Sequence, residues 1–291
     1  MIDYILVFVS VILLALSFVI QKWYQKKADV NGAMSFTIYS ALFSLALLLI
    51  LNGPTPAFSW YSLINATLKS LCCYLYTILG FRLMSQGCVA LYTLFLMSGG
   101  MILPALWGWL FLDEPVLVLR LIGVVVIVVS ISLTHSGERK INASMLLSLC
   151  GVFFLNGMVS VLSKLHQVNT VYETVSTTGY ALLSTVTSLG ISVAVYAFRH
   201  RKTDDRKQPQ KRKNTLILIL IVALYSLTGS VSSLLQLEGA KNLPASVLYP
   251  MITGGSIVLT GIMALIFFGE KLSRREWTAI LLCLGGTFMF L

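Results

Sequence analysis

The sequence predicts an all-α polytopic membrane protein, with ten transmembrane helices arranged as two inverted five-helix repeats. Three observations lead to this fold class. Of the 291 residues, 57% are apolar and 11% are charged, whereas about 25% of the residues of an average soluble domain are charged. Apolar runs of about 20 residues, the length that a membrane-spanning helix needs, occur ten times and leave no room for a soluble domain. The second half of the chain also repeats the pattern of the first half.

Short polar breaks separate the ten apolar runs. Residues 52–56 form a turn, Asp113-Glu114-Pro115 ends one helix and starts the next, and Ser136-Gly137 opens a charged loop. The first run has no basic segment before it and no small-residue cleavage site, so we expect a retained span rather than a signal peptide. The expected spans lie near residues 3–21, 33–51, 59–81, 88–111, 116–134, 143–163, 172–198, 215–237, 243–268 and 274–291.

Basic residues indicate how the chain is oriented. The loops after the odd-numbered spans carry 17 of the 21 lysines and arginines, eight of them in the basic loop at residues 199–213. Lysine and arginine are enriched in cytoplasmic loops, so we expect these loops inside and both termini outside a cell membrane, as in a bacterial plasma membrane. The net charge of +10 therefore encodes orientation and implies no nucleic-acid partner. The other four basic residues are Lys69, Arg120, Lys164 and Lys241.

An internal repeat divides the chain into residues 1–140 and 141–291. A shift of 156 residues places Glu114 on Glu270 and Gly99 on Gly255, although identities are few. Each half holds five spans, an odd number, so the second half must enter the membrane from the opposite side. This is the pattern of an inverted-topology repeat.

The second half resembles a known family. The stretch at residues 237–290, with Pro-Ala-Ser after one helix, a proline in the next and Glu-Lys-Leu before a glycine-containing last helix, resembles the ten-helix EamA-like branch of the drug/metabolite transporter superfamily. The resemblance implies two EamA-like five-helix repeats, with spans 1–4 and 6–9 around a central cavity and spans 5 and 10 at the periphery. It also implies transport of small metabolites. Many ten-helix relatives have cytoplasmic termini, which differs from the orientation that the charges indicate.

Lys69 is the clearest candidate for a binding residue. It lies nine residues after Trp60, an interfacial anchor, and therefore about 13 Å into the helix, near the membrane midplane. A charge at that depth is costly and is a functional candidate by default. Its helix face also carries Cys73 and Tyr76, and the repeat shift predicts a matching polar face with Tyr225 and Gln236. The alternatives are close helix packing at small residues and a lysine that extends its ammonium to the interface.

The residues expected to bind substrate come from both halves and are Lys69, Tyr76, Tyr92, Asn156, Ser160, Tyr225, Ser232, Gln236 and Tyr249. Pro104 and Pro250 interrupt corresponding helices, a feature that points to the transport site. Glu114 and Glu270 are expected to stabilise the N-terminus of the helix that follows each of them. All carboxylates and all three histidines lie in breaks or at span ends, and the five cysteines have no metal-ligand spacing, so no metal or cofactor is expected.

These features favour a secondary active or facilitative transporter of a small polar metabolite that bears a carboxylate or phosphate, such as an amino acid, working by alternating access. An exporter of drugs or organic cations is the alternative within transport, and a membrane receptor or assembly factor is the alternative outside it. An enzyme is not expected, because a catalytic cluster at membrane depth is missing. The expected partners are the lipid bilayer and a small-molecule substrate, and the expected state is a monomer or weak homodimer.

Overall fold

The computed structural model describes residues 2–27, 32–52, 58–85, 89–115, 117–133, 142–200, 215–268 and 274–290. In these ranges the chain forms ten helices, which confirms the predicted all-α fold. They are α1 (Ile2–Lys27), α2 (Gly32–Asn52), α3 (Trp60–Ser85), α4 (Val89–Phe111), α5 (Val118–Leu133), α6 (Ala143–Val168), α7 (Thr177–His200), α8 (Thr215–Asn242), α9 (Ala245–Phe268) and α10 (Arg274–Phe288).

The helices have the composition of membrane spans. Within the described residues, six of them are long and apolar enough to cross a bilayer, namely α1, α3, α6, α7, α8 and α9, and the other four contain shorter apolar stretches. The predicted spans match the ten helices in order, but α1, α3, α6 and α8 continue four to six residues beyond their predicted ends. A helix keeps its backbone hydrogen bonds after the apolar side chains stop, so the hydropathy signal ends first.

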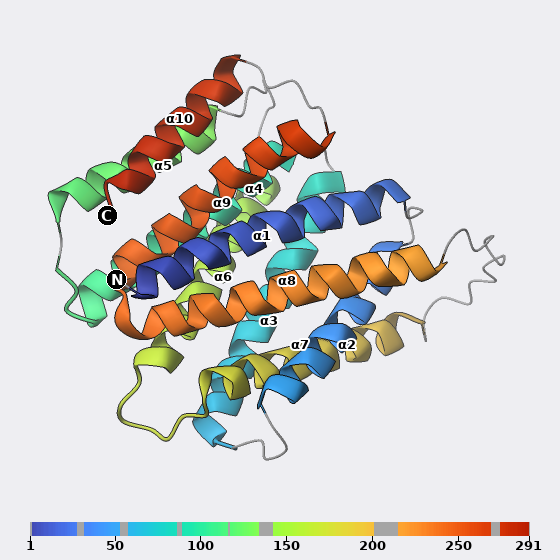
Figure 1. The fold of residues 1–291 in the computed structure, drawn as a ribbon. Helices are drawn as coiled ribbons and strands as arrows, with labels where there is room; N and C mark the ends of the chain where they lie inside the picture. Colours follow the sequence, from blue (N-terminus) through green and yellow to red (C-terminus); the bar gives the residue numbers. More distant parts are fainter. Residues whose placement is uncertain are drawn as a thin grey trace.

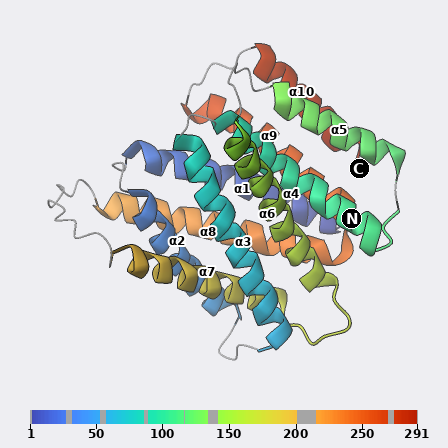
Figure 2. The ribbon, with the colours of Figure 1, turned by 180° about the vertical axis from the view of Figure 1, so that it is seen from behind.

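The most extensive contacts between helices are preserved when each helix is exchanged for the one five positions away. Helix α1 packs on α8 and α9, just as α6 packs on α3 and α4, and α2 packs on α8 just as α7 packs on α3. Helices α5 and α10 pack mainly on each other, at the edge of the bundle (Figures 1 and 2). Both chain ends lie on the same side in Figure 1, as an even number of spans requires.

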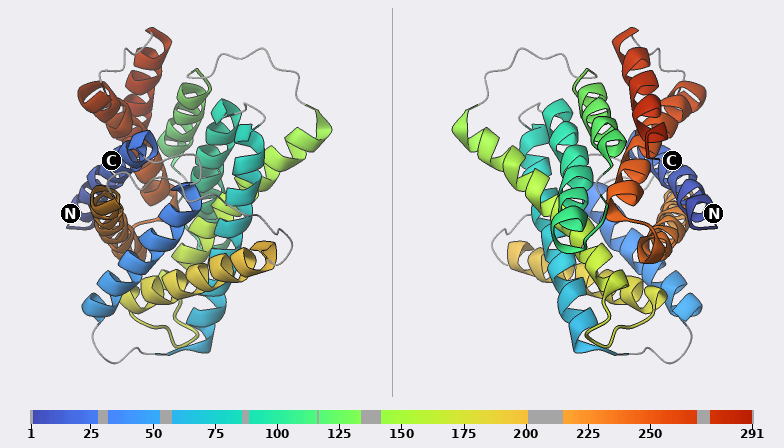
Figure 3. Two further views of the ribbon diagram at one scale, coloured as in Figure 1. Left: turned by 90° about the vertical axis from the view of Figure 1, so that its right-hand side faces the viewer. Right: turned by 90° about the vertical axis from the view of Figure 1, so that its left-hand side faces the viewer.

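The largest buried apolar cluster surrounds α9. Helix α9 contributes Val247, Leu248 and Ile252, and α1 and α4 add Val7 and Met101. Helices α2, α3 and α7 lie on the other side of the bundle, where α7 runs obliquely across α3 (Figure 3). Side chains pack closely around α9, and the cavity therefore lies between the other helices α1, α2, α3, α6, α7 and α8.

Two charged side chains hold the turn between α8 and α9. The buried Lys164 ammonium donates hydrogen bonds to the main-chain oxygens of Ala240, at 2.8 Å, and Leu243, at 2.6 Å. The Glu114 carboxylate accepts hydrogen bonds from the main-chain nitrogens of Ala245, at 2.7 Å, and Ser246, at 3.1 Å. A cation at a helix C-terminus and an anion at an N-terminus both complement unpaired backbone groups and the helix dipole.

The expectation for Glu114 was therefore right in kind and wrong in place. Glu114 caps α9, which lies in the other half of the chain, rather than the next helix, α5. The chain turns back after α4, where the Glu114 main-chain nitrogen bonds to the Gly108 oxygen, and the Glu114 carboxylate reaches the start of α9. Glu270 lies outside the described residues.

Candidate functional site

A cavity of about 430 Å³ lies between six helices and is the candidate binding site. Its volume falls within the range of small-molecule sites in proteins, about 300–1,000 Å³. Its lining comes from α1, α2, α3, α6, α7 and α8, and is made up of Leu14, Ser17, Phe18, Ser40, Ala41, Ser44, Leu48, Lys69, Ser70, Cys73, Val159, Ala181, Ser184, Thr185, Ser188, Tyr225, Ser226, Gly229, Ser230 and Ser233.

Lys69 is the single charged residue of this lining in the described part of the chain. It lies on α3, in the interior of the helix, and its ammonium is 5.0 Å from the centre of the Tyr180 ring. An ammonium over an aromatic face is attracted to the ring's negative charge distribution, which partly offsets the cost of removing it from water. No carboxylate belongs to the lining and no ion pair joins Lys69 to another described residue, so the cavity carries a net positive charge.

Ten serine and threonine residues give the cavity its polar surface. Some of these hydroxyls bond to their own helix: Ser17 donates to the main-chain oxygen of Leu14 at 2.7 Å, and Thr185 to that of Ala181 at 2.9 Å. The Ser184 hydroxyl is buried and has no hydrogen-bond partner among the described residues. A buried polar atom without a partner is costly, which makes Ser184 a candidate contact for a bound polar molecule.

A polar network joins α3, α6 and α7 next to Lys69. The fully buried Tyr180 donates a hydrogen bond from its hydroxyl to Asn65 Oδ1 at 2.7 Å. The ring of His166 stacks on Tyr180, with ring centres 3.8 Å apart. His166 also contacts the Ser62 hydroxyl through Nε2 at 2.8 Å. These contacts fix the Tyr180 ring that faces the Lys69 ammonium.

The neighbours of His166 determine its tautomer. The Gln167 side-chain amide can only donate to His166 Nδ1, because its oxygen accepts from Thr177. Nε2 then carries the proton and donates to Ser62, whose oxygen also accepts from the Val175 main-chain nitrogen at 3.1 Å. His166 is thus a neutral packing residue. The sequence placed every histidine in a break or at a span end, so the burial of His166 was not predicted. His166 is buried because α6 extends past the apolar run to Val168.

The cavity faces of α3 and α8 are related by the repeat shift of 156 residues. Lys69, Ser70 and Cys73 line the cavity from α3, and their counterparts Tyr225, Ser226 and Gly229 line it from α8. Two of the nine predicted binding residues, Lys69 and Tyr225, belong to the lining.

The remaining predicted residues on α3 and α8 lie outside this lining. Tyr76 accepts a hydrogen bond from the Cys73 thiol at 3.4 Å. The fully buried Ser232 donates from its hydroxyl to the main-chain oxygen of Ser10 at 2.7 Å, which joins α8 to α1. The Gln236 amide donates to the Ser232 hydroxyl at 3.0 Å. Ser232 therefore joins α8 to α1, whereas the Gln236 bond lies within α8.

The predicted residues on α4, α6 and α9 also contact neighbouring helices. Asn156 donates from its amide to the main-chain oxygen of Leu96 at 2.7 Å, and the Tyr249 hydroxyl donates to that of Ser160 at 2.6 Å. The Tyr92 ring fills the space next to Gly80 of α3. None of these four predicted residues is part of the described lining, and their role in binding stays a prediction.

Helices α4 and α9 lie behind the cavity. Pro104 and Pro250 lie inside these continuous helices, and neither helix contributes a residue to the described lining. The expectation that the prolines mark the binding site, and the implied position of α4 and α9 around the cavity, therefore do not fit this arrangement. The neighbouring glycines have a packing role, because a side chain at Gly99 would overlap the main-chain oxygen of Phe153 on α6.

Most of the lining hydroxyls were missing from the sequence-based candidates. Serines occur throughout these helices, and each alone is weak support for a site. Their spacing carries a stronger signal, since Ser40 and Ser44 on α2, and Ser184 and Ser188 on α7, are four residues apart and therefore share a helix face. No group of three metal-ligating side chains occurs among the described residues.

Comparisons with known proteins relate this arrangement to a family. The model of the EamA-like transporter family matches residues 143–291, about half of the chain. The probable 4-amino-4-deoxy-L-arabinose-phosphoundecaprenol flippase subunit ArnE of Yersinia pestis (strain Pestoides F) is 34% identical over 84 residues, which are 28% of this chain and 71% of that protein. The corresponding subunit of Yersinia pseudotuberculosis (serotype O:3, strain YPIII) matches with the same identity and coverage.

A solved crystal structure has the same fold. It matches 99% of this chain and 95% of its own chain with a TM-score of 0.73, and its sequence identity of 12% means that the similarity concerns the fold alone. The family match, the ten apolar helices and the central cavity agree with one another. The chain is a multi-pass membrane protein that belongs to the EamA-like transporter family.

Proposed function

We propose that the protein transports a small polar solute bearing a carboxylate or phosphate, which binds in the central cavity with its anionic group at Lys69. The observation that carries the proposal is the Lys69 ammonium in a hydroxyl-lined cavity of about 430 Å³ that has no described carboxylate in its lining. A charge-assisted hydrogen bond is about twice as strong as a neutral one, so an anion is favoured there. An organic cation is disfavoured by the same charge.

The hydroxyls of the cavity support a solute with several polar groups. Ser184 has an unpartnered buried hydroxyl, and Ser44, Ser188 and Ser230 line the cavity on neighbouring helices. The name of the Yersinia relatives adds a lipid-linked sugar phosphate to the candidate solutes, because its phosphate would present the same charge to Lys69. Amino acids, sugar phosphates and lipid-linked sugar phosphates are therefore the classes to test first.

Alternating access is the proposed mechanism. The exchange of α1, α2 and α3 for α6, α7 and α8 preserves the contacts α1–α8 with α6–α3 and α2–α8 with α7–α3, which supports two inverted repeats at residues 1–140 and 141–291. Rearrangement of one repeat against the other would open the cavity to each side in turn.

The test is counterflow into proteoliposomes that contain the purified protein. Vesicles are preloaded with unlabelled amino acids, sugar phosphates, nucleotides or quaternary amines, and uptake of the labelled compound is followed. We expect uptake of an anionic solute, reduced about tenfold or more in Lys69→Gln because a charged hydrogen bond is lost. Lys241→Met, which changes an exposed lysine outside the cavity, is the matched control. Quaternary amine uptake that is unchanged in Lys69→Gln would refute the proposal.

The position of the termini is proposed from the charges. The basic residues favour termini outside a bacterial plasma membrane, and the exposed Ile2 offers a labelling site. An Ile2→Cys variant should react with an impermeant maleimide in intact cells, whereas protection until the cells are broken would reverse the orientation.

We also propose that the protein is a monomer or weak homodimer and does not bind nucleic acid. Light scattering of the protein in detergent, with and without added DNA, would test both points.

A further inference from the structure

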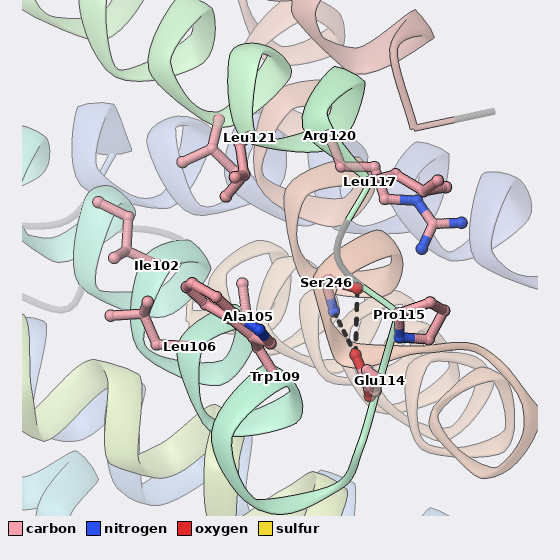
Figure 4. Close-up of a pocket in the computed structure, with 11 residues that line it drawn as sticks. Ile102, Ala105, Leu106, Trp109, Glu114, Pro115, Leu117, Arg120, Leu121 and Ser246 are labelled. Atoms are coloured by element: carbon pink, nitrogen blue, oxygen red, sulfur yellow. Dashed lines mark hydrogen bonds between the residues drawn. The ribbon is translucent and has the colours of Figure 1, made fainter.

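A groove on the lipid-facing surface lies between α4 and α5 and ends at the first turn of α9 (Figure 4). We call it the α4–α5 groove. It has a volume of about 70 Å³ and shares no lining residue with the central cavity. The groove exists because α5 packs mainly on α10 and leaves a seam beside α4. Its lining is Ile102, Ala105, Leu106, Trp109, Glu114, Pro115, Leu117, Arg120, Leu121, Val124 and Ser246.

Most of the groove is apolar and faces outward. Leu106, Trp109, Leu117 and Leu121 are between 39% and 50% exposed. Side chains of this kind on the outside of a spanning helix contact acyl chains rather than water. The volume corresponds to only a few water molecules of about 30 Å³ each, too little for a whole polar solute. The groove fits part of a lipid chain.

Arg120 adds a positive charge to one side of the groove. It lies in the first turn of α5, where its main-chain nitrogen bonds to Leu117, and so near the end of the span. Its Nη1 atom is buried and has no hydrogen-bond partner among the described residues. A guanidinium presents its N–H donors in a planar fork that matches a phosphate. An unpaired buried donor of this kind favours an anion beside it.

The one carboxylate among the described residues of the groove, Glu114, does not neutralise Arg120. Glu114 uses Oε1 to accept from the Ala245 main-chain nitrogen. Its Oε2 accepts from the nitrogen and hydroxyl of Ser246 (Figure 4). Its charge is thus balanced by the N-terminus of α9. No ion pair between Glu114 and Arg120 occurs in the described structure.

We propose that the α4–α5 groove is a binding site for an anionic phospholipid of the bilayer, with the lipid phosphate at Arg120 and the first part of an acyl chain along Leu106, Trp109 and Leu121. The height of Arg120 at the end of the span matches the level of the headgroups. Its guanidinium, whose Nη1 has no hydrogen-bond partner among the described residues, matches the phosphate. The exposed apolar walls match the chain. The site is separate from the transport cavity and does not depend on the solute carried there.

The experiment is native mass spectrometry of the purified full-length protein in detergent, titrated with phosphatidylglycerol or phosphatidylcholine of the same chain length. We expect retention of phosphatidylglycerol over phosphatidylcholine, and about tenfold weaker phosphatidylglycerol binding in Arg120→Gln, since a hydrogen-bonded charge pair is lost. Arg120→Lys keeps the charge without the planar fork, so its affinity for phosphatidylglycerol should lie between those of the unmodified protein and Arg120→Gln. Arg274→Gln is the matched control, because Arg274 is an exposed arginine in the first turn of α10.

Three results would overturn the proposal. Phosphatidylglycerol could bind Arg120→Gln as tightly as Arg274→Gln, or both lipids could bind equally well to the unmodified protein. Alternatively, sn-glycerol 3-phosphate could displace phosphatidylglycerol at millimolar concentration, which would identify a site for a free phosphate. Thermal unfolding without added lipid checks that Arg120→Gln is folded. If Arg120→Gln does not fold, phosphatidylglycerol binding is compared between Arg120→Lys and Arg274→Gln instead.

Discussion

Replacing Lys164 with methionine should destabilise the protein strongly, because it removes the cation that pairs with the last turn of α8. The Lys164 ammonium is 2.8 Å from the main-chain oxygen of Ala240 and 2.6 Å from that of Leu243, and the side chain is only 4% exposed. Hydrogen bonds to charged groups contribute about 1.5–3 kcal/mol each, so the two bonds together contribute about 3–6 kcal/mol. Removing the ammonium also removes the cost of burying its charge, which offsets part of this sum. We expect a net loss of about 2–4 kcal/mol in the free energy of unfolding, working from both principles.

The assay is thermal unfolding of the purified protein in detergent, followed by intrinsic fluorescence. One kcal/mol shifts the midpoint of a large domain by about 2–4 °C, so Lys164→Met should lower it by about 4–16 °C. Lys241→Met is the matched control from the same end of α8, because the Lys241 pair with Glu238 is 41% and 43% exposed and such pairs contribute about 0–1 kcal/mol. Equal midpoints for the two variants would refute the assigned role of Lys164.

Two further predictions concern the packing around the cavity. Gly99→Ala should lower the unfolding midpoint by an amount equivalent to about 1–3 kcal/mol, because the added methyl group overlaps the main chain of α6. Gly190→Ala is the control, because a methyl group there meets nothing within 4 Å and should leave the midpoint unchanged or raised. Similar midpoints for both variants would contradict the close α4–α6 approach. Tyr180→Phe should cost about 1–3 kcal/mol by removing the donor that bonds to the side-chain oxygen of the buried Asn65, and adding Asn65→Leu should restore part of the loss. A double-mutant cycle in thermal unfolding measures this coupling, and purely additive losses would argue against it.

Lys69 illustrates how much of the candidate site can be predicted from the sequence. Its distance from Trp60 along one helix was enough to place it near the midplane, because helical rise is constant. Its contact with Tyr180 could not be predicted, since Tyr180 lies on another helix more than a hundred residues later. The partner of a side chain depends on which helix packs against that face.

Ser232 and Ser233 show why only part of the predicted face of α8 lines the described cavity. Ser233 lines the cavity, whereas Ser232 bonds to Ser10 on α1. Successive residues of a helix point about 100° apart, so a small error in the rotation of the helix exchanges a cavity residue for a packing residue. Periodicity defines a polar face and leaves its rotation about the helix axis open.

The sequence by itself determined that this is a membrane protein with ten helices, because a segment in the bilayer must satisfy its backbone polar groups internally and reveals itself by an apolar run of fixed length. Its repeat pattern and acidic breaks also indicated the family. Only the tertiary structure decided that Glu114 caps α9, that Lys164 caps α8 and that α4 and α9 contribute no residue to the described cavity lining. These outcomes depend on which helices pack together, and the side-chain packing that selects helix neighbours acts between residues far apart in the chain.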